Sequence, residues 1–492
     1  MIMSRKKITP EQMKQLLDGI RERFHIPSYS ATVYDGGTVY SVNGGLRDLE
    51  TGLAPDENTL YAIGSCTKSI VAGTICVLAG EGRLSLDDPV RKFIPEFEMY
   101  DPYVSRHLTV RDMLCHRCGL PRHELSWYAR LDTLTEEEII RKLQFLPPSQ
   151  PFRYKWQYSN QMFALAGFLI QRITGGPWQD AVRRCIFEPL GITRAAFSPA
   201  EARSLGNCAE PYLFNEKKNE HRHIEHAFIG AMGAAGTIYM STAELSRWTR
   251  TLKDGGIFEG REILKKEYAR EMITPQMIRG DEGEPEPLNA VVNNRCYGLG
   301  LETEIFEGRR LVHHGGHIDG FMADLSFLED DDFTLAVLTN VGVIRGGLVM
   351  RYAVSEAVLG GGHDFAAELD AFYAKGRKAL RSGNRKIWRE KPEDRPCPVP
   401  YAAIAGVYED EGYGEIVISE KRGKLYLGMG TATVNMKHYA GPFFYISEPD
   451  ILEDMMFPAE IRTDIGGRVI AVTAQFGTEE AEKITFRRKE RA

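Results

Sequence analysis

Two β-rich regions on either side of a long helical stretch constrain this fold more than any other feature of the sequence. The first, "SYSATVYDGGTVYSVNGG", contains two β-rich runs around Asp35-Gly36-Gly37, which is typical of a hairpin. The second, "YGLGLETEIFEGRRLVHHGGHIDGFMADLSFLEDDDFTLAVLTNV", alternates apolar and polar residues and carries turn residues, which indicates antiparallel strands. We therefore expect an α+β domain whose sheet collects the first and last segments of the domain.

A third β-rich region begins near Tyr401 and consists of short alternating runs. It predicts a small all-β module, a barrel or a sandwich, and we expect the antiparallel barrel. Before it, residues 364–380 have a helical pattern and residues 381–400 read as a charged, proline-marked linker. The predicted division is a large α+β domain over 1–362, a helical and charged linker over 363–398, and the β module over 399–492.

The composition is that of an ordinary globular protein: 492 residues, 43% hydrophobic, 26% charged, with a net charge of −7. This slightly acidic balance gives no reason to expect nucleic acid or an anionic membrane as a partner. The N-terminus has no apolar run of signal-peptide length, and no stretch of about 18 apolar residues occurs elsewhere. We therefore expect a cytoplasmic protein.

The eight cysteines are mostly scattered, which fits a reducing compartment. Cys115 and Cys118 are the one pair with the spacing of a redox or metal site. No second pair follows at the distance typical of a zinc site, so we expect neither a metal nor a cofactor.

Ser65 and Lys68 stand three residues apart in "YAIGSCTKSIVAG", at the predicted start of an apolar helix over 66–80. One helical turn separates them, so both side chains lie on one face. A serine hydroxyl needs a base, and a lysine serves as one only when burial or a neighbouring cation lowers its pKa. The alternative is a capping hydroxyl with a solvated lysine, and the spacing alone does not decide, since Ser4 and Lys7 repeat it.

Tyr158-Ser159-Asn160, the only Tyr-x-Asn in the chain, comes just before an apolar helix predicted over 160–174. A core tyrosine and a helix N-cap are the alternative interpretations of Tyr158 and Asn160, and Asn160 can be both cap and ligand. Further on, "VHHGGHIDGF" places histidines and glycines where the β pattern returns, and glycines there let a backbone approach a ligand closely. A metal cluster is the alternative for His313, His314 and His317.

These elements, in this order, resemble the serine β-lactamase and penicillin-binding-protein superfamily, in particular its branch of class C β-lactamases, D-aminopeptidases and related esterases. Supporting phrases run through residues 40–350 and include "GRLSLDDPVRKFIPEF", "LTVRDMLCHRCGLP" and "GAMGAAGTIYMSTAELSRW". The resemblance implies a β-lactamase-like antiparallel sheet flanked by helices, with an all-helical subdomain. The C-terminal module resembles the small, lipocalin-like barrel appended to many peptidase-like members.

The resemblance also implies roles for individual residues. Ser65 would be the nucleophile that forms an acyl-enzyme, and Lys68 would be hydrogen-bonded to it and share the role of base. Tyr158 would be the second proton-transfer group, bridging Ser65 and the leaving group, and Asn160 would orient Lys68 and the substrate amide. The oxyanion hole would be the backbone N–H groups of Ser65 and His317.

One departure from the family pattern bears on the substrate. His314, with Gly316, stands where β-lactamases carry lysine in the third motif, and a histidine is only partly charged near pH 7. The anchor for a β-lactam carboxylate is therefore weakened, and the motif looks more like that of the aminopeptidase and esterase members.

We expect a serine hydrolase of small amides, peptides or esters, with β-lactamase activity incidental at best. Acyl transfer by the same residues and a non-catalytic protein that keeps the pocket are the alternatives. A small-molecule substrate is the expected partner. The sequence leaves open the substrate's identity and stereochemistry, the oligomeric state, a homo-oligomer included, and the role of the β module.

Overall fold

The computed structural model describes residues 5–130, 133–281, 284–342, 346–430, 432–447, 455–477 and 480–490. The chain divides into two compact units, each assembled from segments that are distant in sequence. The first comprises Met1–Glu96, Arg106–Arg117 and Asn160–Phe372, and the second comprises Phe97–Ser105, Cys118–Ser159 and Tyr373–Ala492.

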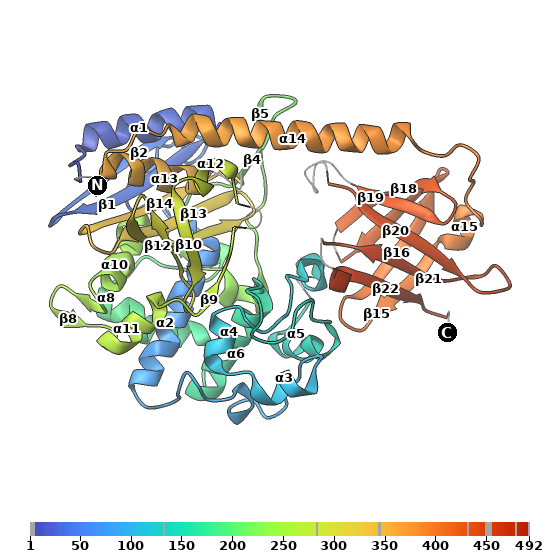
Figure 1. Ribbon diagram of the computed structural model, residues 1–492, viewed down its shortest axis with the longest axis horizontal. Helices are drawn as coiled ribbons and strands as arrows, with labels where there is room; N and C mark the ends of the chain where they lie inside the picture. Colours follow the sequence, from blue (N-terminus) through green and yellow to red (C-terminus); the bar gives the residue numbers. More distant parts are fainter. Residues whose placement is uncertain are drawn as a thin grey trace. The chain divides into compact units, whose positions relative to one another are not determined.

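The first unit is built on an antiparallel sheet that joins the beginning of the chain to its later strands (Figure 1). In the described residues the sheet has eight strands in the order β2-β1-β14-β13-β12-β11-β10-β9. The predicted hairpin forms, and Gly36 and Gly37 turn it with φ of +54° and +89°. The α+β fold class expected from the sequence is confirmed. The strands are β1 (Ser28–Asp35), β2 (Thr38–Gly45), β9 (Met277–Ile278), β10 (Val292–Tyr297), β11 (Glu302–Phe306), β12 (Arg309–Ile318), β13 (Phe321–Leu328) and β14 (Phe333–Thr339).

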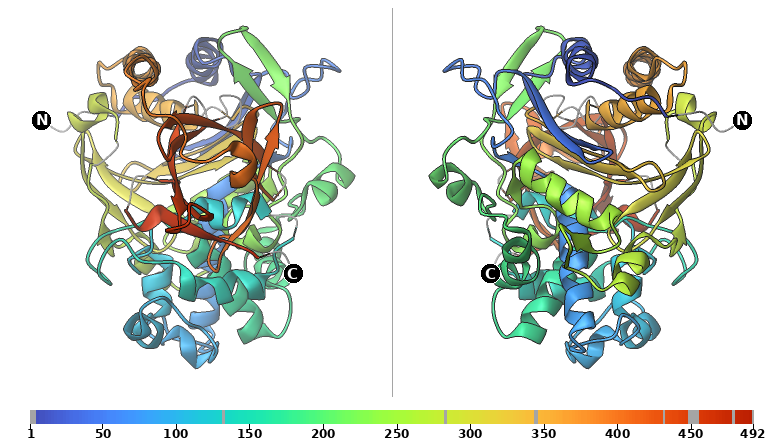
Figure 2. Two further views of the ribbon diagram at one scale, coloured as in Figure 1. Left: turned by 90° about the vertical axis from the view of Figure 1, so that its right-hand side faces the viewer. Right: turned by 90° about the vertical axis from the view of Figure 1, so that its left-hand side faces the viewer.

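Helices cover both faces of this sheet (Figure 2). Helices α1 (Pro10–Arg23) and α13 (Gly346–Leu359) pack together on one face, and α10 (Thr242–Lys253) packs on the other. Helix α2 (Thr67–Gly80) is buried almost throughout, as its lack of polar positions predicts. It packs against α10 so closely that a Cβ at Gly73 would lie 2.4 Å from the Trp248 ring.

Charged side chains are buried between α13 and the sheet. Arg351 of α13 forms an ion pair with Asp324 of β13, and Tyr352 donates a hydrogen bond of 2.7 Å to Glu304 of β11. Burial raises the pKa of Asp324 to about 6, against the lowering effect of the Arg351 charge. Buried charges of this kind are tolerated because each finds an opposite charge or a hydrogen bond.

The second unit contains a closed antiparallel barrel of strands β15–β22, so the barrel expected at the C-terminus is confirmed. The strands are β15 (Gly406–Asp410), β16 (Gly414–Lys421), β17 (Lys424–Met429), β18 (Ala432–Ala440), β19 (Phe443–Ser447), β20 (Phe457–Thr463), β21 (Val469–Gln475) and β22 (Lys483–Arg488).

The barrel shares its unit with segments 97–105 and 118–159. Segment 118–159 holds the short helix α5 (Glu136–Lys142) and the 3₁₀ turns η3 (Glu124–Ser126), η4 (Tyr128–Arg130) and η5 (Leu143–Phe145). Thr135 and Glu138 form the capping box at the start of α5.

Helix α14 (Phe365–Arg389) is longer than the helix predicted over 364–380. It continues through 381–389, which the charges suggested was linker, because arginine and lysine are good helix formers and the first proline comes only at Pro392. Among the described residues, no helix combines the length and the apolar character needed to cross a membrane.

Candidate active site

Ser65 lies in the 3₁₀ turn η1 (Gly64–Cys66), directly before α2. The predicted helix over 66–80 therefore begins one residue later, at Thr67, and Ser65 stands ahead of the helix rather than in its first turn. Gly64 has φ of +49°, a backbone conformation that favours glycine. The turn thereby presents a partly exposed serine at the positive end of a buried helix.

Lys68 is fully buried, so the interpretation of this residue as a solvated surface lysine is wrong. Its Nζ lies 2.9 Å from Ser65 Oγ and donates to Asn160 Oδ1 at 2.7 Å and to the Ala235 carbonyl at 2.6 Å. An ammonium group has three N–H donors, and these three oxygens match them. The ring of Phe163 lies 5.4 Å from Nζ and adds an attractive cation–π contact. These contacts favour the ammonium form of Lys68, whereas burial acts against it.

Asn160 is the first residue of helix α6 (Asn160–Thr174), and its side-chain oxygen is directed to Lys68. Asn160 therefore has both features expected of it: it stands at the start of a helix, and its side chain contacts Lys68.

Strand β12, which carries His314, Gly316 and His317, packs directly on the turn that carries Ser65. A Cβ at Gly316 would lie 1.9 Å from the Ile63 carbonyl oxygen, and a Cβ at Gly64 would lie 2.6 Å from His317 N. The Cys66 thiol donates to the His314 carbonyl at 3.0 Å. The two backbones approach this closely only because glycine stands at both positions.

His314 is held as a neutral imidazole. Its Nδ1 lies 2.7 Å from the Gly315 carbonyl, which can only accept, so Nδ1 carries the proton and Nε2 accepts from the Tyr297 hydroxyl at 2.9 Å. Burial lowers the pKa of His314 to about 4, and the charge of Lys68 acts in the same direction, while Glu302 opposes it. The expected partial charge near pH 7 is thus reduced further, and the position lacks a cation.

The histidines of β12 do not converge on a common point. His313 faces the opposite side of the sheet from His314, with its Nε2 3.5 Å from Glu304 Oε2, and His317 is exposed. In the described ranges, no group of three or more histidine, cysteine or acidic side chains is arranged to hold a metal ion. The eight cysteines, Cys115 and Cys118 included, form no disulfide in the structure.

Tyr158 belongs to the second unit and is partly exposed rather than a fully buried core residue. The guanidinium of Arg122 lies 4.7 Å from the centroid of its ring, and the Trp156 ring lies 6.0 Å away. In the chain, Tyr158 is separated from Asn160 by one residue.

Sequence reasoning did not identify Tyr297 or Arg122. Tyr297 occurs in the family-like phrase "YGLGL", which was the only signal for it, and no pattern in the sequence singled out Arg122.

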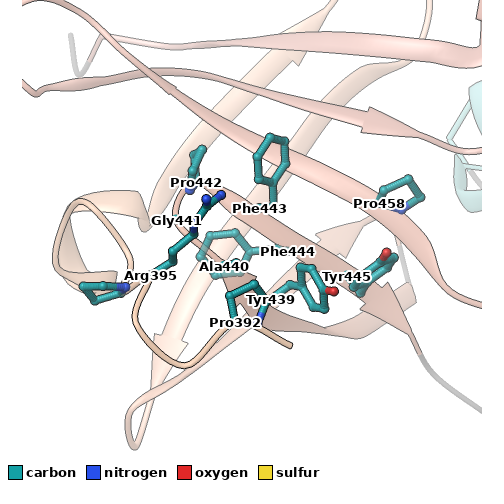
Figure 3. A pocket seen from close by; sticks show the side chains of 11 residues that line it. Pro392, Arg395, Tyr439, Ala440, Gly441, Pro442, Phe443, Phe444, Tyr445 and Pro458 are labelled. Atoms are coloured by element: carbon teal, nitrogen blue, oxygen red, sulfur yellow. The ribbon is translucent and has the colours of Figure 1, made fainter. Parts of the chain in front are cut away.

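The cavity shown in Figure 3 belongs to the second unit and contains none of the predicted site residues. Its volume is about 470 Å³. Its lining has no serine, cysteine or histidine, so we assign it no catalytic role. It is lined by Pro392, Arg395, Pro396, Tyr439, Ala440, Gly441, Pro442, Phe443, Phe444, Tyr445 and Pro458.

The packing of β12 on η1 predicts different effects for two adjacent glycines. Gly316→Ala would force the strand away from Ile63 and displace His317, so the hydrolysis expected from the sequence should fall about 100-fold or more. Gly315→Ala is the matched control, because the nearest atom to its Cβ would be 3.9 Å away, at Asp324. Turnover of a nitrophenyl ester measures both variants, and equal losses would contradict this role for the close approach.

The neutral state of His314 predicts a pH-dependent stability difference. Its pKa of about 4 in the folded protein lies below its usual 6.5, so between these values the unfolded chain binds more protons. Wild type should therefore lose stability relative to His314→Gln as the pH falls from 6.5 towards 4, by up to about 1.4 kcal/mol per pH unit. Urea unfolding at a series of pH values measures the difference, and a constant difference would show that His314 does not titrate in this way.

Comparisons with known proteins agree with this geometry. Residues 13–359 match the family model described as Beta-lactamase, and residues 390–488 match a domain of unknown function, DUF3471. The unguisins hydrolase ungD' of Aspergillus campestris is 25% identical over 475 residues, which cover 92% of this chain and 86% of that protein.

Two solved structures share the fold. The octameric penicillin-binding protein homologue from Pyrococcus abyssi has a TM-score of 0.62 at 21% identity, covering 96% of this chain and 99% of its own. The D-stereospecific amidohydrolase from Streptomyces sp. has a TM-score of 0.57 at 24% identity, covering 71% and 98%. With most of its length matched by one family model, the chain belongs to the β-lactamase family.

Proposed function

We propose that this protein is a serine hydrolase that forms an acyl-enzyme on Ser65 and acts on small amides, peptides or esters. The observation that carries the proposal is the position of Lys68 Nζ, which lies 2.9 Å from Ser65 Oγ in a buried site that also binds the Asn160 side chain. A buried lysine is costly to a fold unless it is paired or used, and here it is directed at a partly exposed hydroxyl.

In the proposed reaction, Lys68 stays protonated and its charge lowers the free energy of the Ser65 alkoxide. The phenolate oxygen of Tyr158 accepts the hydroxyl proton as Ser65 Oγ attacks the substrate carbonyl carbon. The backbone N–H groups of Ser65 and His317 hold the resulting oxyanion. Tyr158 then returns the proton to the departing amine or alcohol, which leaves the acyl group on Ser65.

Water completes the cycle by the same proton path. It attacks the acyl carbonyl while Tyr158 accepts one of its protons, and that proton returns to Ser65 Oγ as the carboxylic acid leaves. This scheme gives Lys68 an electrostatic part and Tyr158 the larger share of base catalysis, because three acceptors favour the ammonium form of Lys68.

The neutral imidazole of His314 favours substrates that have no carboxylate next to it. A neutral, buried imidazole with both nitrogens engaged offers no cation to the carboxylate of a β-lactam or of a peptide C-terminus. Among the relatives, one is named a hydrolase of unguisins and one structural neighbour is a D-stereospecific amidohydrolase, which supports hydrolysis of amide bonds.

Covalent labelling tests the nucleophile. A fluorophosphonate should add its mass to the peptide that contains Ser65, and Ser65→Ala should remain unlabelled. Ser69→Ala is the matched control, because Ser69 is one turn further on and its hydroxyl bonds to the Cys66 carbonyl and Trp248 instead. Folded protein that stays unlabelled, or labelling that survives Ser65→Ala, would refute the assignment.

A substrate panel tests the role of His314. Uncharged D- and L-amino-acid amides and short esters should be hydrolysed with kcat/KM values at least about tenfold above that of a chromogenic cephalosporin, which carries a carboxylate. The inverse ranking would show that the site anchors a carboxylate without a cation at His314, and would move the assignment towards β-lactamase activity.

A further inference from the structure

A turn of the C-terminal barrel is built into the segment that carries Tyr158. This turn, 410–414, joins β15 to β16, and Asp410 Oδ1 shapes it by accepting from the N–H groups of Gly412 and Tyr413, each at 2.9 Å. Lys142 Nζ donates to the Gly412 carbonyl at 3.1 Å. A Cβ at Gly412 would lie 2.8 Å from Leu146, so the turn and segment 118–159 are packed without space between them.

At the centre of this contact is a hydrogen bond between two buried side chains. The Tyr413 hydroxyl lies 2.8 Å from His123 Nδ1, and His123 Nε2 lies 2.9 Å from the Pro147 carbonyl. Because the carbonyl can only accept, Nε2 carries the proton and Nδ1 accepts from Tyr413. Both side chains are at most 1% exposed, and burial lowers the pKa of His123 to about 4, so the imidazole is neutral.

His123 needs such support because its backbone is in the left-handed region, with φ of +43°. A residue other than glycine is strained there, and the conformation persists only where the surroundings hold it. Its two side-chain hydrogen bonds, one of them to the barrel, provide that hold. The direction of the next residue back, Arg122, depends on this backbone conformation.

Arg122 lies over the ring of Tyr158, 4.7 Å from its centroid, and also pairs with Glu124 at 3.0 Å. Its side chain is 55% exposed. A guanidinium over a phenol attracts the ring and attracts the phenolate more strongly, because the phenolate carries a full negative charge.

The residue before Tyr158 is also held by hydrogen bonds within segment 118–159. Gln157 donates to Ser149 Oγ, and the N–H groups of Ser149 and Gln150 donate to the Gly119 carbonyl. Tyr158 is thus held within the same segment that the barrel contacts.

We infer that Tyr413 and His123 are positioning residues for catalysis: through them the barrel fixes Arg122 over Tyr158, where its charge stabilises the phenolate that accepts the Ser65 proton. The barrel would then contribute to catalysis by positioning Arg122. This inference rests on the proposed function, because it takes Tyr158 as the proton acceptor.

The test compares two barrel tyrosines in the full-length protein. Tyr413→Phe removes the hydroxyl on His123 but keeps the ring that packs against Phe476 and Phe486. Tyr408→Phe is the matched control, because Tyr408 is also buried in the barrel and loses one hydrogen bond, to the Ile404 carbonyl.

With a nitrophenyl ester, Tyr413→Phe should lower kcat about fivefold with KM within about twofold of wild type, and Tyr408→Phe should change neither beyond about twofold. Hydrogen exchange in residues 118–127 should quicken only in Tyr413→Phe. Equal kcat values for the two variants would overturn the inference.

Arg122 variants test the charge itself. Arg122→Gln should lower kcat about tenfold or more, and Arg122→Lys should recover part of the loss, because it keeps a cation without the planar group. A wild-type kcat in Arg122→Gln would overturn the inference.

Tyr158→Phe separates the two levels of the proposal. An inactive Tyr158→Phe beside normal Tyr413→Phe and Arg122→Gln would refute the role of the barrel and leave the proposed function standing. A fully active Tyr158→Phe would refute the proposed proton path, and the inference with it.

Discussion

The buried ammonium of Lys68 is the interaction on which the rest of the first unit depends. A buried charge is costly unless hydrogen bonds replace those it makes with water. Lys68 receives them from three separate parts of the unit: Ser65 before α2, Asn160 at the start of α6, and the Ala235 carbonyl. Two helices and a 3₁₀ turn are thereby fixed relative to one another. One of the hydrogen bonds that stabilise the Lys68 charge is to the Ser65 hydroxyl. The contacts that hold this part of the unit together therefore also place the ammonium group beside the proposed nucleophile.

The second constraint is steric. Strand β12 meets the turn of Ser65 backbone to backbone, through glycines at 64 and 316, and the buried face behind the strand carries the Asp324–Arg351 pair. A buried ion pair thus lies on the side of the sheet away from Ser65, and the close backbone contacts lie on the side towards it. His314 lies within this fit, and its neutrality follows from burial rather than from its residue type alone.

The sheet and the barrel could be predicted because alternation and turn residues are local signals. The grouping of Ser65, Lys68 and Asn160 was implied by the resemblance to a known family and not by any local signal. The sequence was not sufficient for the contacts that tune these residues. The Tyr297 hydrogen bond to His314 depends on a strand pairing across β10, β11 and β12, and Tyr413 lies 290 residues from His123. The extent of α14 was underestimated because the charges and prolines of residues 381–400 suggested a linker. That Tyr158 exchanges a proton with Ser65 stays a prediction from the resemblance to the family.

The fit of turn 410–414 has a consequence for how such chains diverge. A Cβ at Gly412 would lie 2.8 Å from the Leu146 side chain and 3.2 Å from the Phe145 carbonyl, so a larger residue there would require the opposing segment to adjust. Exchange of barrel strands should therefore disturb this chain less than exchange of the one turn that packs on segment 118–159.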